Sequence, residues 1–452
     1  MRARRYLALL ALAICAIVLA ACGGSDNDDG GASTSAGGDS GGQVEISFLT
    51  HWAPETAAAL ERVTAAYEAD HPNVRIDVRA VPFADLLTTL RSQAGSDDGP
   101  TMASIYDLWL PELVRDGVLS RAPEANATEV DGEWPENLAS AASVEGGVYG
   151  YPNEVDLYAL NWNKRLFREA GIGGPPRTWD ELVATAQRLT KKDGDRITQQ
   201  GFGLISSWAA GTVHPWTSLL YSNGGELIDA DGRAALDSPQ AGETFELVDE
   251  LANGAKVSSA QMSTADANTT GPYLENFVSG KTGMIIMANW WESALRAGMR
   301  DGFADVGTAP IPVGPSGDGP SSVSYSWLTV VNGKASAEQQ AAAWEFLAYL
   351  NSPESGREGA SAMAALLQSM GILPSRTSDL EAYRGDLSRE FLKAYVEELP
   401  NAKPFPIVLG GQEFTEALQR NLEALQAGQM SASDAQERSQ QDAESVLETA
   451  AG

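Results

Sequence analysis

The chain has 452 residues and a formal net charge of −30, with 31 Lys and Arg against 61 Asp and Glu. A balance this acidic argues against a nucleic-acid partner and against adhesion to anionic lipid by charge. The length is enough for two or more domains, each with its own core.

The N-terminus has the pattern of a secretory signal peptide. Three Arg residues among the first five precede the apolar run 6–21, which is shorter than the roughly 20 residues that a membrane-spanning helix needs. The run ends in Leu19-Ala20-Ala21-Cys22, which resembles a bacterial lipobox. We therefore expect a lipoprotein signal peptide at 1–21, cleavage after Ala21 and lipid on Cys22. An ordinary signal peptide with an incidental Cys is the alternative.

Residues 22–43 are expected to form a flexible tether. From Asp26 to Gly42 the segment is rich in Gly, Ser and Asp and has no bulky apolar residue, so it cannot offset the entropy of its own ordering. Of the two Cys residues, Cys15 leaves with the signal and Cys22 would carry the lipid. The folded part would then have no disulfide, and its stability has to come from its apolar core.

The first part of the folded chain alternates strands and helices. Period-2 alternation and buried apolar runs indicate the strands, and apolar residues at helical spacing indicate the helices. The expected strands are 44–49, 74–79 and 102–106, and the expected helices are 54–70, 83–94 and 110–116. This β-α-β-α-β order predicts an α/β fold with a mostly parallel sheet and crossover helices.

A new unit is expected to begin with the strand 155–163. Thr178 or Asp180 can cap the helix that follows Pro175 and Pro176. Further strands are expected at 148–152, 203–205, 282–287 and 322–331, further helices at 180–192, 212–222, 239–253, 338–350, 413–427 and 433–450, and a loop at 310–320. The sequence has no internal repeat and no second apolar run long enough to span a membrane.

Several motifs, in this order along the chain, resemble one bacterial protein family. The stretch 147–182 reads GVYGYPNEVDLYALNWNKRLFREAGIGGPPRTWDEL, and shorter matches follow at 277–284 (FVSGKTGM), 312–317 (PVGPSG), 343–347 (AWEFL) and 371–374 (GILP). Together they are similar to the family 1 extracellular solute-binding proteins of bacterial ABC importers, whose best-known member is the maltose-binding protein. Each match is short, but their order and spacing cover nearly the whole mature chain.

The resemblance implies a two-lobe α/β fold of the periplasmic-binding-protein type, class II, with a hinge between the lobes. Lobe I would be 44–153 plus 322–351, and lobe II would be 154–321 plus 352–452. By the same resemblance the protein is a monomer that binds a mono-, di- or short oligosaccharide in the cleft, without catalysis, cofactor or metal. It would hand the sugar to the transmembrane subunits of an ABC permease, outside the cell membrane to which lipidated Cys22 anchors it.

A sugar site needs aromatic faces for the C–H surfaces of the ring and polar side chains for its hydroxyls. Ligands of open α/β sheets bind beyond the carboxyl ends of the strands. At those positions the sequence has Trp52 and Glu55 after the first strand, and Tyr106, Asp107 and Trp109 at the end of the third. We therefore expect these residues among the ligand contacts.

Further candidates come from the resemblance alone. Asp156 stands where the best-known member has an acidic contact to sugar hydroxyls, and Trp290 stands where it has a stacking Trp. The remaining candidates are Trp208, His214, Trp216 and Trp291, together with Tyr325 and Trp327. These last two lie in the returning strand where many members of the family have glycines, a departure that indicates a more filled cleft or a different ligand. That member's late stacking Trp has no counterpart at 409–414, so a long oligosaccharide subsite is not expected there. Outside the site, the tryptophans expected in the core are Trp162, Trp179 and Trp344, and Trp134 is expected to anchor a surface loop.

Two alternatives remain open at this point. A glycerophosphodiester or polyol phosphate would need Arg, Lys or helix N-termini in the cleft, whereas the candidates are mainly aromatic and acidic. A secreted glycoside hydrolase would need only two carboxylates, and 61 acidic residues do not exclude it. The three His residues lack the His-Glu-x-x-His spacing of a zinc hydrolase.

Overall fold

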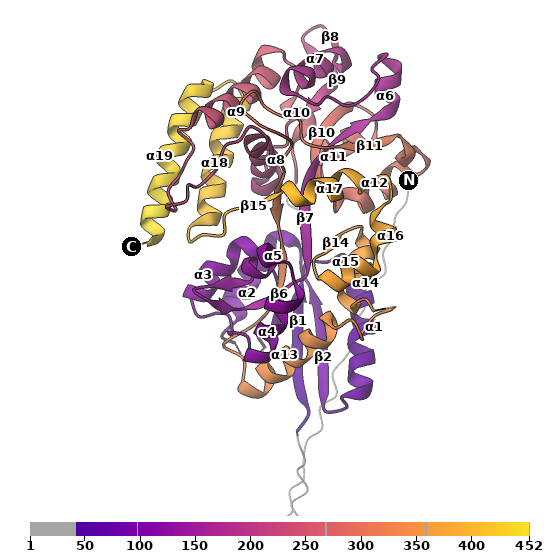
Figure 1. Ribbon diagram of the computed structural model, residues 1–452, viewed down its shortest axis with the longest axis vertical. Helices are drawn as coiled ribbons and strands as arrows, with labels where there is room; N and C mark the ends of the chain where they lie inside the picture. The colour runs from indigo at the N-terminus through magenta and orange to yellow at the C-terminus, as the bar shows by residue number, and fades with distance from the viewer. Residues whose placement is uncertain (1–41, 97, 267–268, 358, 452) are drawn as a thin grey trace, which may run out of the picture. The chain divides into compact units, whose positions relative to one another are not determined.

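A mostly parallel sheet forms from the alternating segments at the start of the folded chain (Figure 1). The computed structural model describes residues 42–96, 98–266, 269–357 and 359–451; the expected signal peptide, Cys22 and the tether up to residue 41 lie outside the described residues. The elements of this part are β1 (Val44–Thr50), α1 (Pro54–Asp70), β2 (Val74–Ala80), α2 (Phe83–Gln93), β3 (Met102–Tyr106), the 3-10 turn η1 (Asp107–Trp109), α3 (Leu110–Arg115), α4 (Glu124–Glu133), α5 (Glu136–Ala141), β4 (Ser143–Val144), β5 (Gly147–Val148), β6 (Gly150–Pro152) and, from later in the chain, β13 (Trp327–Val331) and α13 (Ala337–Asn351).

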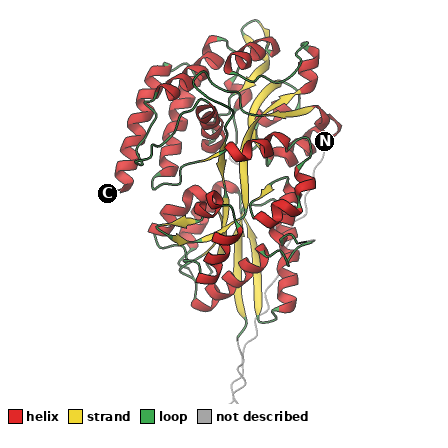
Figure 2. Cartoon of the chain, in the orientation of Figure 1, coloured by secondary structure: helices red, strands yellow, loops and turns green. Residues whose placement is uncertain are grey.

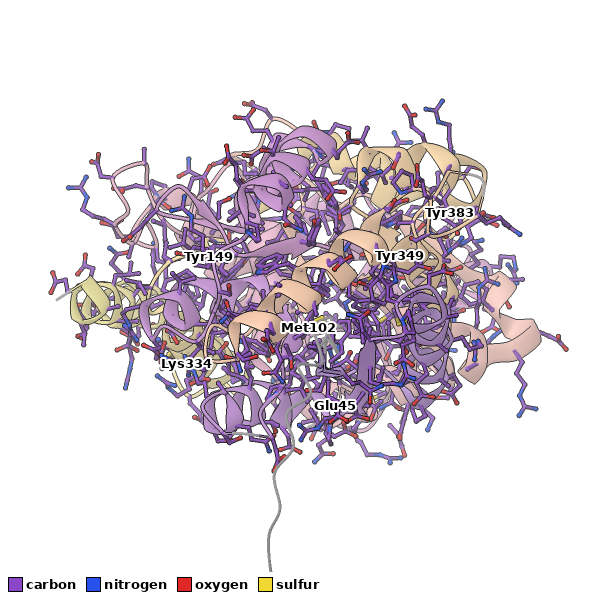
Figure 3. All side chains as sticks on the ribbon, turned by 90° about the horizontal axis from the view of Figure 1, so that it is seen from below. Glu45, Met102, Tyr149, Lys334, Tyr349 and Tyr383 are labelled. Carbon is purple, nitrogen blue, oxygen red and sulfur yellow. The ribbon has the colours of Figure 1, made fainter. Side chains whose placement is uncertain are left out.

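The strand order of this first sheet is β2-β1-β3-β13-β6. β1 pairs in parallel with β2 and β3, as the β-α-β-α-β order predicts, whereas β13 pairs antiparallel with β3 and β6. Helices α1, α2 and α13 pack against the sheet. In the view from below in Figure 3, the fully buried Met102 of β3 lies near the middle, while Tyr149, Lys334 and Tyr383 lie farther out.

The second sheet is built around one long, almost fully buried strand, β7 (Glu154–Asn163). The other elements of this part are α6 (Lys164–Glu169), α7 (Trp179–Leu189), β8 (Lys191–Asp193), β9 (Arg196–Gly203), α8 (Ala209–Ser222), α9 (Pro239–Asp249), the π-turn η2 (Glu250–Gly254), α10 (Ala260–Ser263), α11 (Pro272–Val278), β10 (Thr282–Ala288), α12 (Trp291–Met299), η3 (Arg300–Asp305), β11 (Val306–Ala309) and β12 (Val323–Tyr325). β7 pairs antiparallel with β10, β11 and β12, and β10 pairs in parallel with β9.

The last part of the chain is mainly helical, as predicted (Figure 2). Its elements are α14 (Ala362–Met370), β14 (Leu373–Pro374), α15 (Thr377–Ala382), α16 (Arg384–Leu387), α17 (Lys393–Glu398), η4 (Leu399–Asn401), β15 (Lys403–Pro404), α18 (Gly411–Gln426) and α19 (Ala432–Ala451). α18 buries Phe414, Leu418, Leu422 and Leu425, whose spacing of three or four residues places them on one face. That face packs on α8 and α9, and α19 covers α9 and α18.

The predicted and observed elements differ at several places. The strand predicted at 203–205 lies earlier in the chain, because β9 runs from Arg196 to Gly203 and pairs with β8 and β10. The predicted strand 322–331 is two strands, β12 and β13, which belong to different sheets and are separated by Ser326. The predicted helix 180–192 ends with α7 at Leu189, because β8 then pairs with β9. The residues of β8 are exposed and polar, so they lack the apolar alternation that identifies a half-buried strand. At the other end of α7, Thr178 is the cap, accepting the backbone N–H of Glu181 at 3.3 Å.

The chain crosses between the sheets at Asn153 and again at Ser326. The backbone N–H of Asn153 donates to the carbonyl of Trp327 (2.8 Å), and the hydroxyl of Ser326 donates to the carbonyl of Glu154 (2.6 Å), so the two crossings are bonded side by side. The carboxylate of Asp107 accepts the backbone N–H of Ser326 (2.6 Å). A third segment, β14, pairs with the start of β7. The residues at which one lobe ends and the other begins, expected at 153/154, 321/322 and 351/352, stay a prediction.

Replacing Gly201 of β9 by Ala should destabilise the second sheet. A Cβ at this position would lie 1.9 Å from the carbonyl oxygen of Ala186 in α7, a backbone atom that cannot turn aside. We expect a loss of about 1–3 kcal/mol, the usual range for an overpacked site, seen as a lower midpoint of denaturant unfolding. Gly319→Ala is the control, because a Cβ there meets nothing within 4 Å. An unchanged midpoint for Gly201→Ala would contradict the observed packing of α7 on β9.

Candidate functional site

A cavity of about 480 Å³ lies where the two sheets meet. Residues at or near the ends of β1, β3 and β13 and the start of α2 supply one part of its lining. Residues of β7, α8, β12 and the start of α12 supply the other part, together with the segment from α14 to β14. The carboxyl ends of β1 and β3 therefore do face a cavity, as expected for an α/β sheet.

Trp327 is the centre of an aromatic cluster on the first-sheet side. His51 stacks on its ring with centroids 4.0 Å apart and an interplanar angle of 26°. Phe83, Tyr106 and Trp109 contact the same ring at centroid distances of 6.1, 6.1 and 5.9 Å. Aromatic neighbours at these distances hold the indole in a defined orientation.

Trp290 is the corresponding aromatic residue on the second-sheet side. It stacks on Trp291 with centroids 3.8 Å apart and an interplanar angle of 16°, and Trp208 meets its ring at a steep angle at 6.1 Å. Its indole N–H donates to the hydroxyl of Tyr325 (2.6 Å). Trp291 in turn donates its indole N–H to Tyr273 (2.9 Å), which fixes the ring behind Trp290.

Two carboxyl groups of β7 line the cavity between these aromatic clusters. Glu154 and Asp156 are two residues apart, so they project from the same face of the strand, and they are 3% and 0% exposed. Burial raises the pKa of Asp156 to about 7, although its neighbours Glu154, Asn289 and Tyr325 partly offset the rise. Burial and the adjacent Asp156 carboxyl raise the pKa of Glu154 well above its usual range.

The carboxyl oxygens of this pair are incompletely hydrogen-bonded. Within the described residues, neither oxygen of Asp156 has a hydrogen-bond partner, and Oε2 of Glu154 has none. The hydroxyl of Tyr158, the next residue on the same face of β7, is also without a partner there. Buried polar atoms without partners are uncommon in proteins, and a group of them beside a cavity is typical of a site that a polar ligand completes.

Tyr106 and His214 connect the two sides of the cavity. The hydroxyl oxygen of Tyr106 and Nε2 of His214 are 2.9 Å apart. Burial lowers the pKa of His214 to about 3 and that of His51 to about 4, so both rings are neutral at pH 7. Among the described residues that line the cavity there is no Lys or Arg. The cavity is therefore aromatic and acidic.

Many of the predicted contact residues line this cavity. They are Trp52, Glu55, Tyr106, Asp156, Trp208, His214, Trp290, Tyr325 and Trp327. Their contact with a ligand stays a prediction. The structure shows that the chain brings them together from six helices and strands and from three of the segments that connect such elements.

The other predicted contact residues pack behind the cavity. They are Asp107, Trp109, Trp216 and Trp291. Asp107 bonds to the crossing at Ser326, and burial raises its pKa to about 8, partly offset by the backbone N–H groups of Ser326 and Leu108. Trp109 donates to the side chain of Gln412 (3.2 Å), and Trp216 packs on Phe245 of α9 at 4.8 Å. Each of these residues thus has a structural role in this fold.

Several lining residues were not among the predicted contacts. They are His51, Ala53, Thr56, Phe83, Glu154, Ala210, Thr269, Ser293, Ser369, Met370 and Ile372. Glu154 had a usable signal, because it lies two residues before Asp156 and directly precedes the predicted strand 155–163, which in the structure begins one residue earlier. Ser369, Met370 and Ile372 had none, since they come from α14 and the turn to β14, far from β7 in the sequence.

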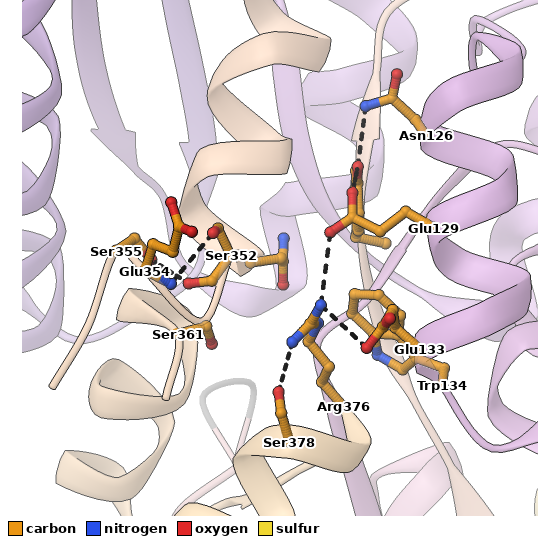
Figure 4. Close-up of polar contacts among 12 residues, drawn as sticks. Asn126, Glu129, Glu133, Trp134, Ser352, Glu354, Ser355, Ser361, Arg376 and Ser378 are labelled. Carbon is orange, nitrogen blue, oxygen red and sulfur yellow. Dashed lines mark hydrogen bonds and ion pairs between the residues drawn. The ribbon is translucent and has the colours of Figure 1, made fainter. Parts of the chain in front are cut away.

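Trp134, predicted to anchor a surface loop, lies in the short connection between α4 and α5, and its side chain is 4% exposed. Its indole N–H donates to the carbonyl of Pro152 (2.8 Å), and the guanidinium of Arg376 lies over its ring at 5.4 Å (Figure 4). Arg376 also pairs with Glu133 (3.3 Å). The segment that covers Trp134 comes from a distant part of the chain, which no local pattern indicates. Of the tryptophans predicted in the core, Trp179 and Trp344 are buried and Trp162 is half-buried.

Two further features bear on the chemistry of the protein. Within the described ranges, no group of three or more His, Cys, Asp or Glu side chains is arranged to hold a metal ion. No helix of those ranges combines the length and the apolar character needed to cross a bilayer.

Comparison with known proteins shows to which family the chain belongs. The family model for bacterial extracellular solute-binding proteins matches residues 52–357. A putative binding protein of Brucella abortus (strain 2308) is 26% identical over 390 residues, which cover 86% of this chain and 89% of that protein. The diacetylchitobiose binding protein DasA of Streptomyces coelicolor is 26% identical over 312 residues, 67% of this chain and 66% of that protein.

A solved structure shows the same architecture. The cyclic alpha-maltosyl-1,6-maltose binding protein from Arthrobacter globiformis matches with a TM-score of 0.72 at 25% identity, covering 90% of this chain and 100% of that one. The likeness confirms the predicted fold class, a two-lobe α/β fold of the periplasmic-binding-protein type. The ligand of this chain does not follow from the fold alone.

The buried carboxyls at the cavity should contribute less to the stability of the ligand-free protein as the pH rises from 5 to 8, whereas the buried His51 and His214, whose pKa values are lowered, contribute more between pH 5 and about 6.5. The folded-state pKa values of Asp156 (about 7), Asp107 (about 8) and Glu154 are raised, so their contribution to stability is present at low pH and is lost as the pH rises through those values. The Asp156→Asn variant lacks one such group. Its free energy of unfolding should therefore fall less between pH 5 and pH 8 than that of the parent, by about 1 kcal/mol or more. Denaturant unfolding at both pH values measures the difference. The same pH dependence in parent and variant would contradict the burial of an ionisable Asp156.

Proposed function

Because the chain belongs to the bacterial extracellular solute-binding proteins, we propose that it captures a carbohydrate in this cavity and delivers it to an ABC permease. The observation that carries the proposal is the combination of Trp290 and Trp327 with the unpartnered carboxyl of Asp156 in one cavity. Aromatic faces suit the C–H surfaces of a sugar ring, and carboxyl oxygens accept hydrogen bonds from its hydroxyls. The names of the Streptomyces and Arthrobacter proteins, which bind diacetylchitobiose and a cyclic maltosyl-maltose, support the same ligand class.

The size of the cavity favours a short ligand. A volume of about 480 Å³ lies within the usual range for small-molecule sites and suits a mono-, di- or short oligosaccharide. A glycerophosphodiester or polyol phosphate is the alternative within the same transport role. It is disfavoured because the described lining residues include buried carboxyls and no Lys or Arg.

Binding without chemistry is the activity that we propose. A glycoside hydrolase would need two carboxyl groups on either side of the scissile bond, one protonated and one ionised. Glu154 and Asp156 instead project side by side from one face of β7, and burial raises the pKa of both. This arrangement suits the capture of a polar group better than its hydrolysis.

The crossings at Asn153 and Ser326 are the proposed hinge. They lie at the ends of strands that belong to different sheets, and rotation about a few such residues would open and close the cavity. We propose that these crossings separate two lobes. Lobe I consists of 44–153 and 322–351, and lobe II consists of 154–321 and 352–452. Closure would bring Trp327 and Trp290 onto the two faces of one ligand.

Replacement of Trp290 by Ala should weaken binding of the sugar that gives the largest thermal shift in a panel of sugars, polyols and glycerophosphodiesters. We expect the dissociation constant to rise about tenfold or more, because one aromatic face is removed. Trp162→Ala, a half-buried Trp outside the cavity, is the matched control and should bind normally. Isothermal titration gives both affinities. A loss below about threefold would contradict stacking on Trp290, and no shift with any sugar would contradict the carbohydrate proposal.

We also propose a lipid-anchored monomer outside the cell membrane, held by lipid on Cys22 beside its permease. The lipobox-like sequence before Cys22 and the Gly- and Ser-rich tether after it support this placement. A Cys22→Ala variant expressed in a bacterial host should leave the membrane fraction, which fractionation and immunoblotting measure. Retention of the variant in the membrane fraction would contradict lipid anchoring. Ser25→Ala, just beyond the same motif, is the control and should remain membrane-bound.

A further inference from the structure

The cavity has an unbalanced charge. Glu154 and Asp156 line it, Asp107 lies close enough behind to raise the pKa of Glu154, and the two lining His residues are neutral at pH 7. The buried or half-buried Arg residues of the described ranges form their ion pairs outside the cavity. Arg376 pairs with Glu129 and Glu133, and Arg389 pairs with Glu292. None of the ion pairs within the described ranges includes a carboxyl of the cavity. The fold therefore gathers acidic groups here without a cation of its own.

Neutral donors can stabilise one of these carboxylates but not both. Asn289 and Tyr325 are the neutral neighbours that lower the pKa of Asp156, and the amide nitrogen of Asn289 has no hydrogen-bond partner within the described residues. The groups that affect Glu154 are, besides burial, only the carboxyls of Asp156 and Asp107, and all of them raise its pKa. With a neutral sugar in the cavity, one carboxyl of the pair would have to stay protonated, because two adjacent buried charges repel.

A cation in the ligand would resolve this imbalance. A protonated amine donates up to three hydrogen bonds and forms charge-assisted bonds with carboxylates, which are about twice as strong as neutral ones. The surrounding rings favour a cation as well, because the faces of Trp and Tyr carry negative partial charge. Trp52, Trp290 and Trp327 all line the same cavity.

Building on the proposed function, we propose that the carbohydrate captured here carries a protonated amine, an amino sugar, and that the amine lies against Glu154 and Asp156. The ring of the sugar then lies between the aromatic clusters of Trp290 and Trp327. The specificity for the amine resides in the two carboxyl groups of β7, whereas the aromatic residues recognise the ring. Loss of the carboxylates should therefore change which sugar is preferred without abolishing sugar binding.

The test uses pairs of sugars that differ only in an amine in place of a hydroxyl. Glucosamine with glucose, galactosamine with galactose, and the corresponding disaccharides are titrated calorimetrically against the purified protein at pH 7. The amino member of the pair that binds best should bind at least about tenfold more tightly than its hydroxyl partner, since a charge-assisted bond in a buried site replaces a neutral one.

Two variants locate the preference. Asp156→Asn and Glu154→Gln keep the shape of each side chain and remove the charge, so each should reduce the preference for the amino sugar by about tenfold. Glu398→Gln is the matched control, because Glu398 is also buried with a pKa raised to about 7 but does not line the cavity. It should leave the preference unchanged.

The outcomes separate this proposal from the one on which it rests. Equal or tighter binding of the hydroxyl member in every pair would overturn the amino-sugar assignment and leave carbohydrate capture standing. A preference for the amine that survives in both variants would overturn the role of Glu154 and Asp156. No binding of any member of any pair would overturn both proposals.

Discussion

The fold and the cavity both depend on strand β7. Its pairing with β10, β11, β12 and β14 holds the second sheet together, and it follows directly on β6 of the first sheet through Asn153. The same strand, labelled β7 in Figure 1, therefore belongs to the second sheet. It also carries Glu154 and Asp156, which line the cavity between residues of both sheets. A change that shifted its register by one residue would move both carboxyls to the opposite face.

Burying two carboxyl groups side by side works against stability, and the surroundings show how the chain accommodates them. Burial raises the pKa of Asp156 to about 7 and that of Glu154 well above its usual range, which opposes the build-up of two adjacent charges. The aromatic residues around them are well packed: His51 stacks on Trp327, and Trp291 stacks on Trp290. Rigid aromatic side chains combined with unsatisfied polar groups are the arrangement expected of a preorganised binding site.

Much of this architecture follows from local sequence patterns. Alternation and helical spacing identify α1, β3 and most of β7, and strand ends correctly indicate that Trp52 and Tyr106 lie beside the cavity. What local patterns do not contain is the partner of each segment. The exposed strand β8 has no apolar face, and the break at Ser326 lies inside an otherwise continuous strand pattern. Met370, like the cover over Trp134, is positioned only by tertiary contacts.

A crystal structure of the protein with the sugar that binds most tightly would test the central claim most directly. The sugar is predicted to lie in the cavity between the two sheets, with its ring on Trp290 and a polar group within hydrogen-bond distance of Asp156. A sugar bound at another surface, or one in the cavity that leaves both oxygens of Asp156 without a partner, would contradict the account.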